Sequence, residues 1–326
     1  RAYCECLSRH TTGARLIAIG GGRRAPELAA MYGVEPAQDV DGLLARPDLS
    51  AVIIATPEMM HVDQAGRAAQ RGKHILVEKP MAPGVAACDE MTAAAARAGV
   101  TLMVVKHWRF RGVHRRARDL LAGGAFGAVR RIENRTRVAL ASSLATVAQK
   151  PFYLDPAGGG LLMGWAVHNL DWVRALASAE PRSVTARSFP EAAGIGPSRM
   201  EAEFIFANGV TARVEVAIDL PASPGPGETF RTLIEAERGR LDLDGYGALR
   251  ISRGGEWETI WTQPAFDPRN ATDPIRLEAY AAIVQAFIDT VRSKATPPIT
   301  GWDGRMAVAM FAAAREAAAR NEAVTC

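Results

Sequence analysis

The sequence predicts an α/β protein with two parts, a domain built on a parallel sheet and an α+β domain built on a large, mostly antiparallel open sheet. In about the first hundred residues, short apolar runs alternate with helix-like segments, the pattern of a parallel sheet covered by helices. Farther along, longer segments place apolar residues at every second position, which is typical of an antiparallel sheet with one apolar face. We expect domains at residues 1–106 and 107–326.

The first part is expected to contain four parallel strands and three helices. The expected strands are Leu16–Ile19, Ala51–Ala55, Ile75–Val77 and Leu102–Val105. The expected helices are Ala25–Tyr32, Met60–Arg71 and Val85–Arg97. Ligands of parallel sheets bind at the carboxyl ends of the strands. These ends carry Gly20–Gly22, Thr56–Pro57, Glu78–Lys79 and Lys106–Arg109, which makes them the candidate ligand site.

The second part is expected to begin with a helix at Arg116–Leu121, stopped by Gly123 and Gly124. Asn208-Gly209 is a hairpin turn signal between two alternating segments, Met200–Phe206 and Thr211–Ile218. The further elements expected are strands Leu233–Glu237, Arg240–Leu243, Ala248–Ser252 and Trp257–Trp261, a loop at Pro221–Gly227, and helices Leu277–Ser293 and Trp302–Ala319. Because the apolar face of such a sheet needs a cover, we expect the chain to form a homo-oligomer.

Composition excludes several classes of function. Of the 326 residues 48% are hydrophobic and 23% charged, as in ordinary globular proteins. The net charge is only +4, and the arginines at 115, 116 and 118 form a short solvated face, so no nucleic-acid partner is expected. The four cysteines fit neither a zinc site nor a disulfide framework, which favours no metal and a cytoplasmic location. No apolar run reaches membrane-spanning length, so no membrane partner is expected.

Three strings together resemble one enzyme family. They are ATPEMMH at residues 55–61, VEKPMA at residues 77–82 and AGGGLLMGWAVHNLDW at residues 157–172. This combination resembles the Gfo/Idh/MocA family of NAD(P)-dependent oxidoreductases over nearly the whole chain. The resemblance implies a Rossmann-type first domain and a substrate-binding and oligomerisation second domain, whose open sheet pairs in a homodimer or homotetramer. It also implies hydride transfer between nicotinamide and a sugar, inositol or other cyclic alcohol.

Lys79 is the first catalytic residue that the resemblance implies, because in the family this lysine bonds the substrate hydroxyl near the nicotinamide. Glu78 and Pro80 flank it and are assigned with it to the cofactor site. A partly buried lysine can have a lowered pKa and assist proton transfer. The Lys–Pro bond is often cis in relatives. The alternative is a surface lysine paired with Glu78.

His168 is the second implied catalytic residue, and histidine is a usual proton acceptor for an alcohol. The alternative is a buried structural histidine that pairs locally with Asp171. Relatives usually carry an Asp four residues earlier, where this chain has Gly164, so their full proton relay is not carried over. Trp165 is a candidate for stacking on a substrate ring, although a tryptophan at helical spacing also suits a core.

Thr56, Pro57 and His61 match the family segment that lines the nicotinamide side, with a solvent-facing histidine as the alternative for His61. Arg109 lies where relatives carry an arginine near the substrate. An arginine there can hold a hydroxyl, carboxylate or phosphate. A structural salt bridge is the alternative.

The cofactor preference is predicted from Gly21, Gly22, Arg23 and Arg24. A carboxylate at the end of the second Rossmann strand holds the ribose hydroxyls of NAD, whereas an arginine accommodates the 2′-phosphate of NADP. Glycines and arginines therefore favour NADP, with NAD possible; a plain glycine turn is the alternative. The Gly-x-Gly-x-x-Gly turn that should precede these residues is not found, and the first strand is expected to be missing in front of Arg1.

The resulting hypothesis is an NAD(P)-dependent dehydrogenase or reductase that acts on CH–OH groups of a small-molecule substrate. Gly164 favours one alternative, a non-catalytic dinucleotide-binding regulatory protein of the same fold. A truncated fragment with little stability is a third possibility, which a cooperative thermal transition would exclude. The residues do not identify the substrate.

Overall fold

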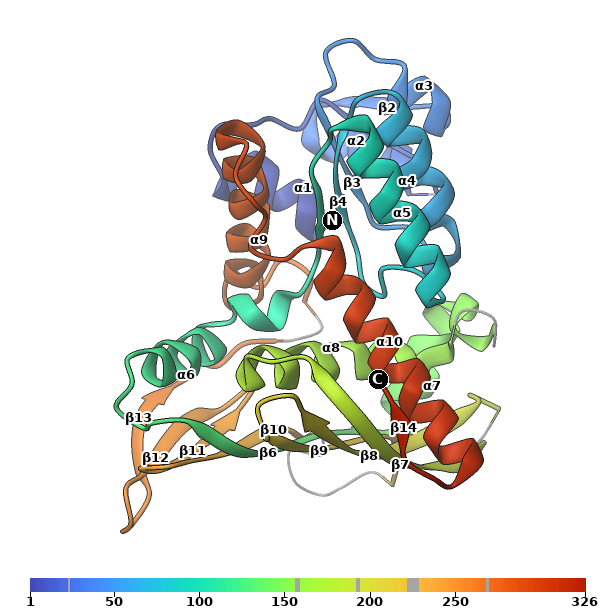
Figure 1. The fold of residues 1–326 in the computed structure, drawn as a ribbon. Helices are drawn as coiled ribbons and strands as arrows, with labels where there is room; N and C mark the ends of the chain where they lie inside the picture. The colour runs from blue at the N-terminus through green and yellow to red at the C-terminus, as the bar shows by residue number, and fades with distance from the viewer. Residues whose placement is uncertain (23, 156–158, 192–193, 222–228, 268–269) are drawn as a thin grey trace. The chain divides into compact units, whose positions relative to one another are not determined.

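The computed structural model describes residues 1–22, 24–155, 159–191, 194–221, 229–267 and 270–326, and the chain forms two compact units (Figure 1). The first unit is Arg1–Phe110 with Ala265–Arg305, and the second is Arg111–Pro264 with Met306–Cys326. The predicted boundary after residue 106 lies close to the end of the first segment. The return of residues 265–305 to the first unit was not part of the sequence prediction.

Five parallel strands form the sheets of the first unit. They are β1 (Ala18–Gly20), β2 (Glu35–Ala37), β3 (Ala51–Ile54), β4 (His74–Val77) and β5 (Leu102–Val104). β1 pairs with β2, and β3-β4-β5 form a second sheet. Among the described residues no strand joins the two sheets. The predicted parallel architecture is confirmed, and the strand β2 was not predicted.

Helices cover these strands. They are α1 (Ala2–Glu5), a π-helical turn η1 (Cys6–His10), α2 (Ala25–Tyr32), α3 (Val40–Leu44), the 3-10 turn η2 (Glu58–Met60), α4 (His61–Gln70), α5 (Val85–Ala98), the 3-10 turn η3 (His107–Phe110), α9 (Pro274–Ser293) and the beginning of α10 (Gly301–Arg320). The Asp273 side chain caps α9 by accepting from the backbone N–H of Ile275 and Arg276. The inner face of α9, including Ile283 and Phe287, packs against Leu76 and Met103 in one buried cluster.

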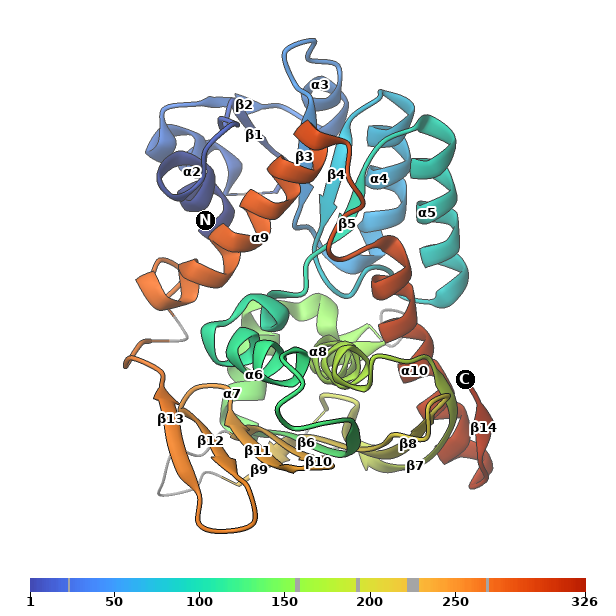
Figure 2. The ribbon, with the colours of Figure 1, turned by 60° about the vertical axis from the view of Figure 1, so that its left-hand side comes forward.

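A nine-stranded sheet is the basis of the second unit, in the order β13-β12-β11-β10-β6-β9-β8-β7-β14 (Figure 2). Its strands are β6 (Val129–Ala139), β7 (Pro181–Glu191), β8 (Pro197–Phe206), β9 (Thr211–Leu220), β10 (Thr229–Ala236), β11 (Gly239–Asp244), β12 (Ala248–Ser252), β13 (Glu258–Thr262) and β14 (Val324–Thr325). The predicted hairpin of β8 and β9 is confirmed, with Gly209 at φ +86° in its turn. The loop expected at Pro221–Gly227 lies, except for Pro221, outside the described residues.

One face of this sheet is covered by helices of the same unit, and Figures 1 and 2 show α6, α7 and α8 on one side of it. These elements are α6 (Gly112–Ala122), α7 (Leu140–Gln149), the 3-10 turn η4 (Pro151–Leu154) and α8 (Gly160–Ala177). In β6, Ile132 and Val138 are buried, whereas the side chains that alternate with them are charged. These charged residues are Arg131, Glu133, Arg135 and Arg137.

The face of the nine-stranded sheet opposite the helices differs from what we expected. We expected an apolar face in need of a cover, but the apolar residues of β6 lie on the buried face and the alternating residues form ion pairs. Arg137 holds Glu215 of β9 through two hydrogen bonds of 3.0 Å, and Arg199 of β8 lies 3.4 Å from the same carboxylate. Arg231 pairs in the same way with Asp242. In β6 the charged residues alternate with buried ones, so the face of the sheet opposite the helices is charged.

Candidate active site

Lys79 lies in a turn directly after β4, and its neighbours are fixed by hydrogen bonds within the first unit. The carboxylate of Glu78 accepts a hydrogen bond from the Tyr3 hydroxyl through one oxygen and from the backbone N–H of Lys79, at 3.0 Å, through the other. The Lys79–Pro80 peptide bond is cis. Glu78 therefore anchors the backbone from which the Lys79 side chain extends.

Electrostatics at this turn suit a proton-transferring lysine. Burial lowers the pKa of Lys79 from its ordinary value, and the carboxylates of Glu78 and the buried Glu58 oppose part of that change. A lysine with a lowered pKa exchanges its proton at a pH closer to neutrality than a solvated one. The side chain can therefore act as a hydrogen-bond donor and as a proton carrier.

His61 lies beneath this turn, with only 1% of its surface exposed. Its Nε2 lies 2.9 Å from the carbonyl oxygen of Thr56, and its Nδ1 lies 3.1 and 3.2 Å from those of Pro80 and Met81. The Thr56 hydroxyl in turn donates to Gln64 at 2.7 Å. The predicted residues Thr56, Pro80 and His61 are thus close together, but the histidine joins two turns and does not face solvent.

The turn after β1 contains two glycines in the left-handed backbone region. Gly21 and Gly22 have φ values of +77° and +76°, which favour glycine, and added Cβ atoms there would meet nothing within 4 Å. Ala25 N–H donates to the Gly22 carbonyl at 3.2 Å as α2 begins, and Arg24 is exposed beside it. The position of Arg23 lies outside the described residues. The described residues of this turn therefore leave the backbone after β1 open on the side of the glycines.

Arg109 forms an ion pair inside the first unit. Its guanidinium lies 3.1 Å from Asp303, and both side chains are mostly buried. Asp303 also accepts from the backbone N–H and the hydroxyl of Thr300, both at 2.8 Å. The salt bridge weighed for Arg109 in the sequence analysis is therefore present.

His168 belongs to the second unit, on α8, and is 4% exposed. The next residue, Asn169, is fully buried and fixes the rotation of the helix over the sheet. Its amide donates to Asn134 and, at 2.8 Å, to the hydroxyl of Thr136, both on β6. Asn134 donates onward to Thr232 at 2.9 Å. This network holds the helix that carries His168, and it was not predicted from the sequence.

Trp165 lies on the same helix and is half-buried. Its ring centroid lies 5.5 Å from that of Phe230, which in turn contacts Tyr246 at 4.7 Å. The Arg111 guanidinium lies 4.5 Å from the centre of the Tyr246 ring. Trp165 is thus part of an aromatic cluster over β10.

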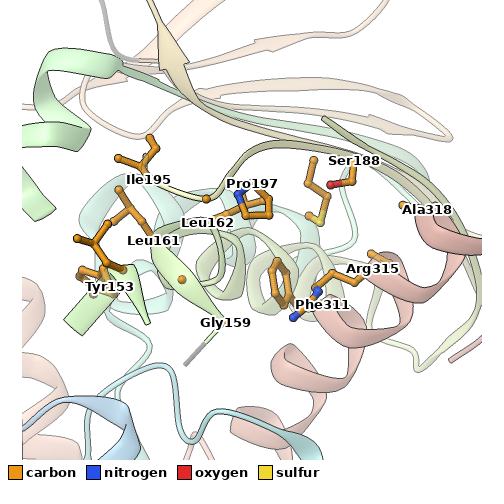
Figure 3. Close-up of a pocket in the computed structure, with 15 residues that line it drawn as sticks. Tyr153, Gly159, Leu161, Leu162, Ser188, Ile195, Pro197, Phe311, Arg315 and Ala318 are labelled. Atoms are coloured by element: carbon orange, nitrogen blue, oxygen red, sulfur yellow. The ribbon is translucent and has the colours of Figure 1, made fainter. Parts of the chain in front are cut away.

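A cavity of about 140 Å³ lies at the start of α8, where Gly159 and Gly160 have φ values of +81° and +71°. Figure 3 shows Tyr153 and Ile195 on one side of this cavity and Phe311 on the other. Tyr153 also packs against Gly164, so one ring contacts both the cavity wall and the helix. Gly158 lies outside the described residues. Tyr153 was not predicted as a site residue, because its contact with Gly164 joins positions eleven residues apart.

The described part of the chain lacks two kinds of feature. No group of three or more His, Cys, Asp or Glu side chains there is arranged to hold a metal ion. No helix within the described ranges is both long and apolar enough to cross a membrane.

Comparison with known proteins gives consistent matches. The model for an oxidoreductase family with an NAD-binding Rossmann fold, GFO/IDH/MocA, matches residues 1–106, and the model for the C-terminal domain of the same family matches residues 114–242. A 1,5-anhydro-D-fructose reductase from Ensifer adhaerens is 31% identical over 87% of this chain and 82% of its own. D-xylose 1-dehydrogenase (NADP(+)) 2 from Haloferax volcanii is 29% identical over 85% and 80%.

A solved structure shows the same fold. It is an oxidoreductase from Agrobacterium radiobacter in complex with NAD+, L-tartaric acid and magnesium. Its TM-score is 0.85 at 21% identity, and the match covers 99% of this chain and 94% of that chain.

Proposed function

Because the chain belongs to the GFO/IDH/MocA family of oxidoreductases, we propose that it transfers a hydride between a nicotinamide cofactor and the hydroxyl-bearing carbon of a sugar, an inositol or another cyclic alcohol. The observation that carries this proposal is the Lys79 turn. There burial lowers the pKa of a lysine that follows a parallel strand. The Glu78 carboxylate accepts a hydrogen bond from the backbone N–H of this lysine, and the His61 ring lies 3.1 Å from the Pro80 carbonyl oxygen. Ligands of parallel sheets bind at such strand ends.

The proposed chemistry divides between the cofactor and two side chains. Nicotinamide, when bound, supplies the hydride acceptor or donor. Lys79 donates a hydrogen bond to the substrate oxygen and so polarises the carbonyl or alcohol. His168 takes the hydroxyl proton in the oxidation direction and returns it in the reduction direction. Arg109 and Trp165 are proposed to contact the substrate, and Thr56, Pro57 and Pro80 to contact the cofactor.

The test is turnover. The purified chain, NADP+ or NAD+ and a panel of sugars, inositols and cyclic alcohols should give nicotinamide absorbance change with at least one substrate. Lys79→Met should then lower kcat by about a hundredfold or more, since general acid–base groups contribute about 10² to 10⁴. Lys294→Met, at an exposed lysine of the same unit, is the matched control. Full activity in the Lys79 variant would refute the assignment.

NADP is the proposed preferred cofactor. Support comes from the open glycine turn, from the exposed Arg24 and from the absence of a carboxylate between Gly20 and Ala25. The relative from Haloferax volcanii is named for NADP(+). Fluorescence titration should show tighter binding of NADPH than of NADH, and Arg24→Ala should weaken NADPH alone by about tenfold, the loss of one charge-assisted contact of about 1.4 kcal/mol. Arg97→Ala is the control, and equal affinities would contradict the preference.

Gly164 favours a second candidate function, a regulatory protein that binds the dinucleotide without turnover. The chain has a glycine at position 164, where the resemblance implies a catalytic carboxylate. This candidate predicts tight cofactor binding without oxidation of any alcohol in the panel. Turnover that Lys79→Met abolishes would exclude it.

The remaining proposals concern organisation. Residues 1–106 are proposed to bind the dinucleotide and residues 107–326 to bind substrate and assemble a homodimer or homotetramer. The charged face of the nine-stranded sheet, with its alternating arginines and carboxylates, supports contact with a second copy of the chain. Light scattering should then show dissociation as salt rises, because screening weakens exposed ion pairs. All four cysteines are free, which supports a cytoplasmic location.

A further inference from the structure

Gly164 and Tyr153 fit one another as a pair. An ideal Cβ added at Gly164 would lie 2.9 Å from Cε1, 3.3 Å from Cζ and 3.4 Å from the hydroxyl oxygen of Tyr153. Carbon atoms that are not bonded do not approach within 3.0 Å without displacing one another. A side chain at position 164 is therefore excluded while the ring is in place. The glycine makes room for the Tyr153 ring.

The ring is held from several sides. Tyr153 lies in η4, its backbone N–H donates to the Lys150 carbonyl at 3.1 Å, and its ring centroid lies 4.6 Å from that of Phe152. Only 8% of the residue is exposed. The hydroxyl end lies against α8 at Gly164, and the same side chain forms part of the cavity wall with Gly159 and Gly160 (Figure 3).

The helix places this phenol beside the proposed proton acceptor. Gly164 and His168 are four residues apart on α8, so they lie on one face of the helix, one above the other. The Tyr153 hydroxyl, 3.4 Å from the Cβ position of residue 164, thus lies over the turn that precedes His168.

We propose that Tyr153 supplies the polar group that Gly164 lacks, and that its phenol hydroxyl hydrogen-bonds the substrate beside His168. This inference rests on the proposed function. A phenol both donates and accepts a hydrogen bond and is uncharged near neutral pH, whereas a carboxylate is ionised and only accepts. The site therefore presents a neutral hydroxyl to the substrate on this side and no negative charge from position 164.

The first test removes only the hydroxyl. Tyr153→Phe keeps the ring against Gly164 and should lower kcat at least tenfold, with the melting temperature and the NADPH dissociation constant unchanged. Tyr32→Phe, a phenol in the first unit that donates to Glu5, is the matched control. Unchanged kcat and KM in Tyr153→Phe would overturn the proposal. A loss of stability that accounts for the whole loss of activity would overturn it as well.

The second test reads the pairing without activity. Gly164→Ala should lower the melting temperature by several degrees in the wild-type background, because its methyl group meets the ring. In a Tyr153→Ala background the same change should cost nothing, because the ring is gone. Equal shifts in both backgrounds would refute the pairing of the two residues.

The activities of the wild-type chain and of Tyr153→Phe distinguish a failure of this inference from a failure of the proposed function. A wild-type chain that oxidises no alcohol refutes the proposed function, and the role of Tyr153 in substrate binding falls with it. A wild-type chain that is active, together with an equally active Tyr153→Phe variant, refutes the role of Tyr153 alone.

Discussion

Replacing His61 by phenylalanine tests whether this histidine holds the Lys79 turn. Phenylalanine keeps most of the ring volume but removes both ring nitrogens, which approach the carbonyl oxygens of Thr56, Pro80 and Met81 at 2.9 to 3.2 Å. Carbonyl oxygens only accept, so a ring nitrogen bonds to them only when it carries a hydrogen, and one such bond contributes about 1 kcal/mol net. The expected loss is about 1 to 2 kcal/mol for one or two donating nitrogens, rising to about 4 kcal/mol if the carbonyls are left without water.

The measurement is thermal unfolding without cofactor, joined to steady-state kinetics. For a compact unit of this size, about 1 kcal/mol corresponds to a shift of about 2 to 4 °C, so Tm should fall by about 2 to 8 °C. His10→Phe, at an exposed histidine, is the matched control and should leave Tm unchanged within about 1 °C. In molecules that remain folded, kcat should fall because the Lys79 turn has lost its support.

One result would refute this reasoning about His61. If His61→Phe kept the wild-type Tm and kcat while NADPH binding weakened, the side chain would act on the cofactor directly, as the sequence first suggested. A loss of Tm with unchanged kcat would show that the histidine stabilises the fold without positioning Lys79.

Three further predictions concern other parts of the molecule. Burial and Glu78 raise the pKa of Tyr3, so its stabilising effect is fully present below about pH 10, the value for an unfolded chain, and is lost as pH rises through the higher folded value; urea unfolding between pH 7 and 11 should show this loss in wild type and not in Tyr3→Phe. Asn169→Leu leaves buried partners unsatisfied and should lower the unfolding free energy by about 1 to 3 kcal/mol and also lower kcat, measured by urea titration and turnover. Arg109→Ala breaks the ion pair with Asp303 and should lower Tm by a few degrees, whereas a raised KM with unchanged Tm would favour substrate contact over a structural role.

Local signals predicted the elements that position the site. The apolar runs before Glu78 and the alternating residues around Asn208-Gly209 gave strands within a few residues of those observed. These signals predict strands and turns correctly because both depend on residues that are neighbours in the sequence. The same holds for the glycine turn after β1, whose positive φ values need glycine.

Contacts between distant residues were not predictable in this way. The return of residues 265–305 to the first unit depends on packing of α9 against strands almost two hundred residues earlier. β6 was missed because its sequence is dominated by charged residues, although every second position is buried. Tyr153 carries no motif, and its importance follows only from the ring that lies on Gly164.

The strict alternation in β6 also has a consequence for how the chain folds. A shift of this strand by one residue would exchange its two faces and bring three arginines and a glutamate beneath α8, in place of Ile132 and its neighbours. Burying unpaired charges costs several kcal/mol for each ion, so four of them together would offset the about 5 to 15 kcal/mol by which a folded protein is stable. β6 pairs with β10 on one side and β9 on the other, so the same penalty rejects misaligned pairing across the middle of the sheet. The charged residues of β6 therefore disfavour misaligned strand pairing while the chain folds or refolds.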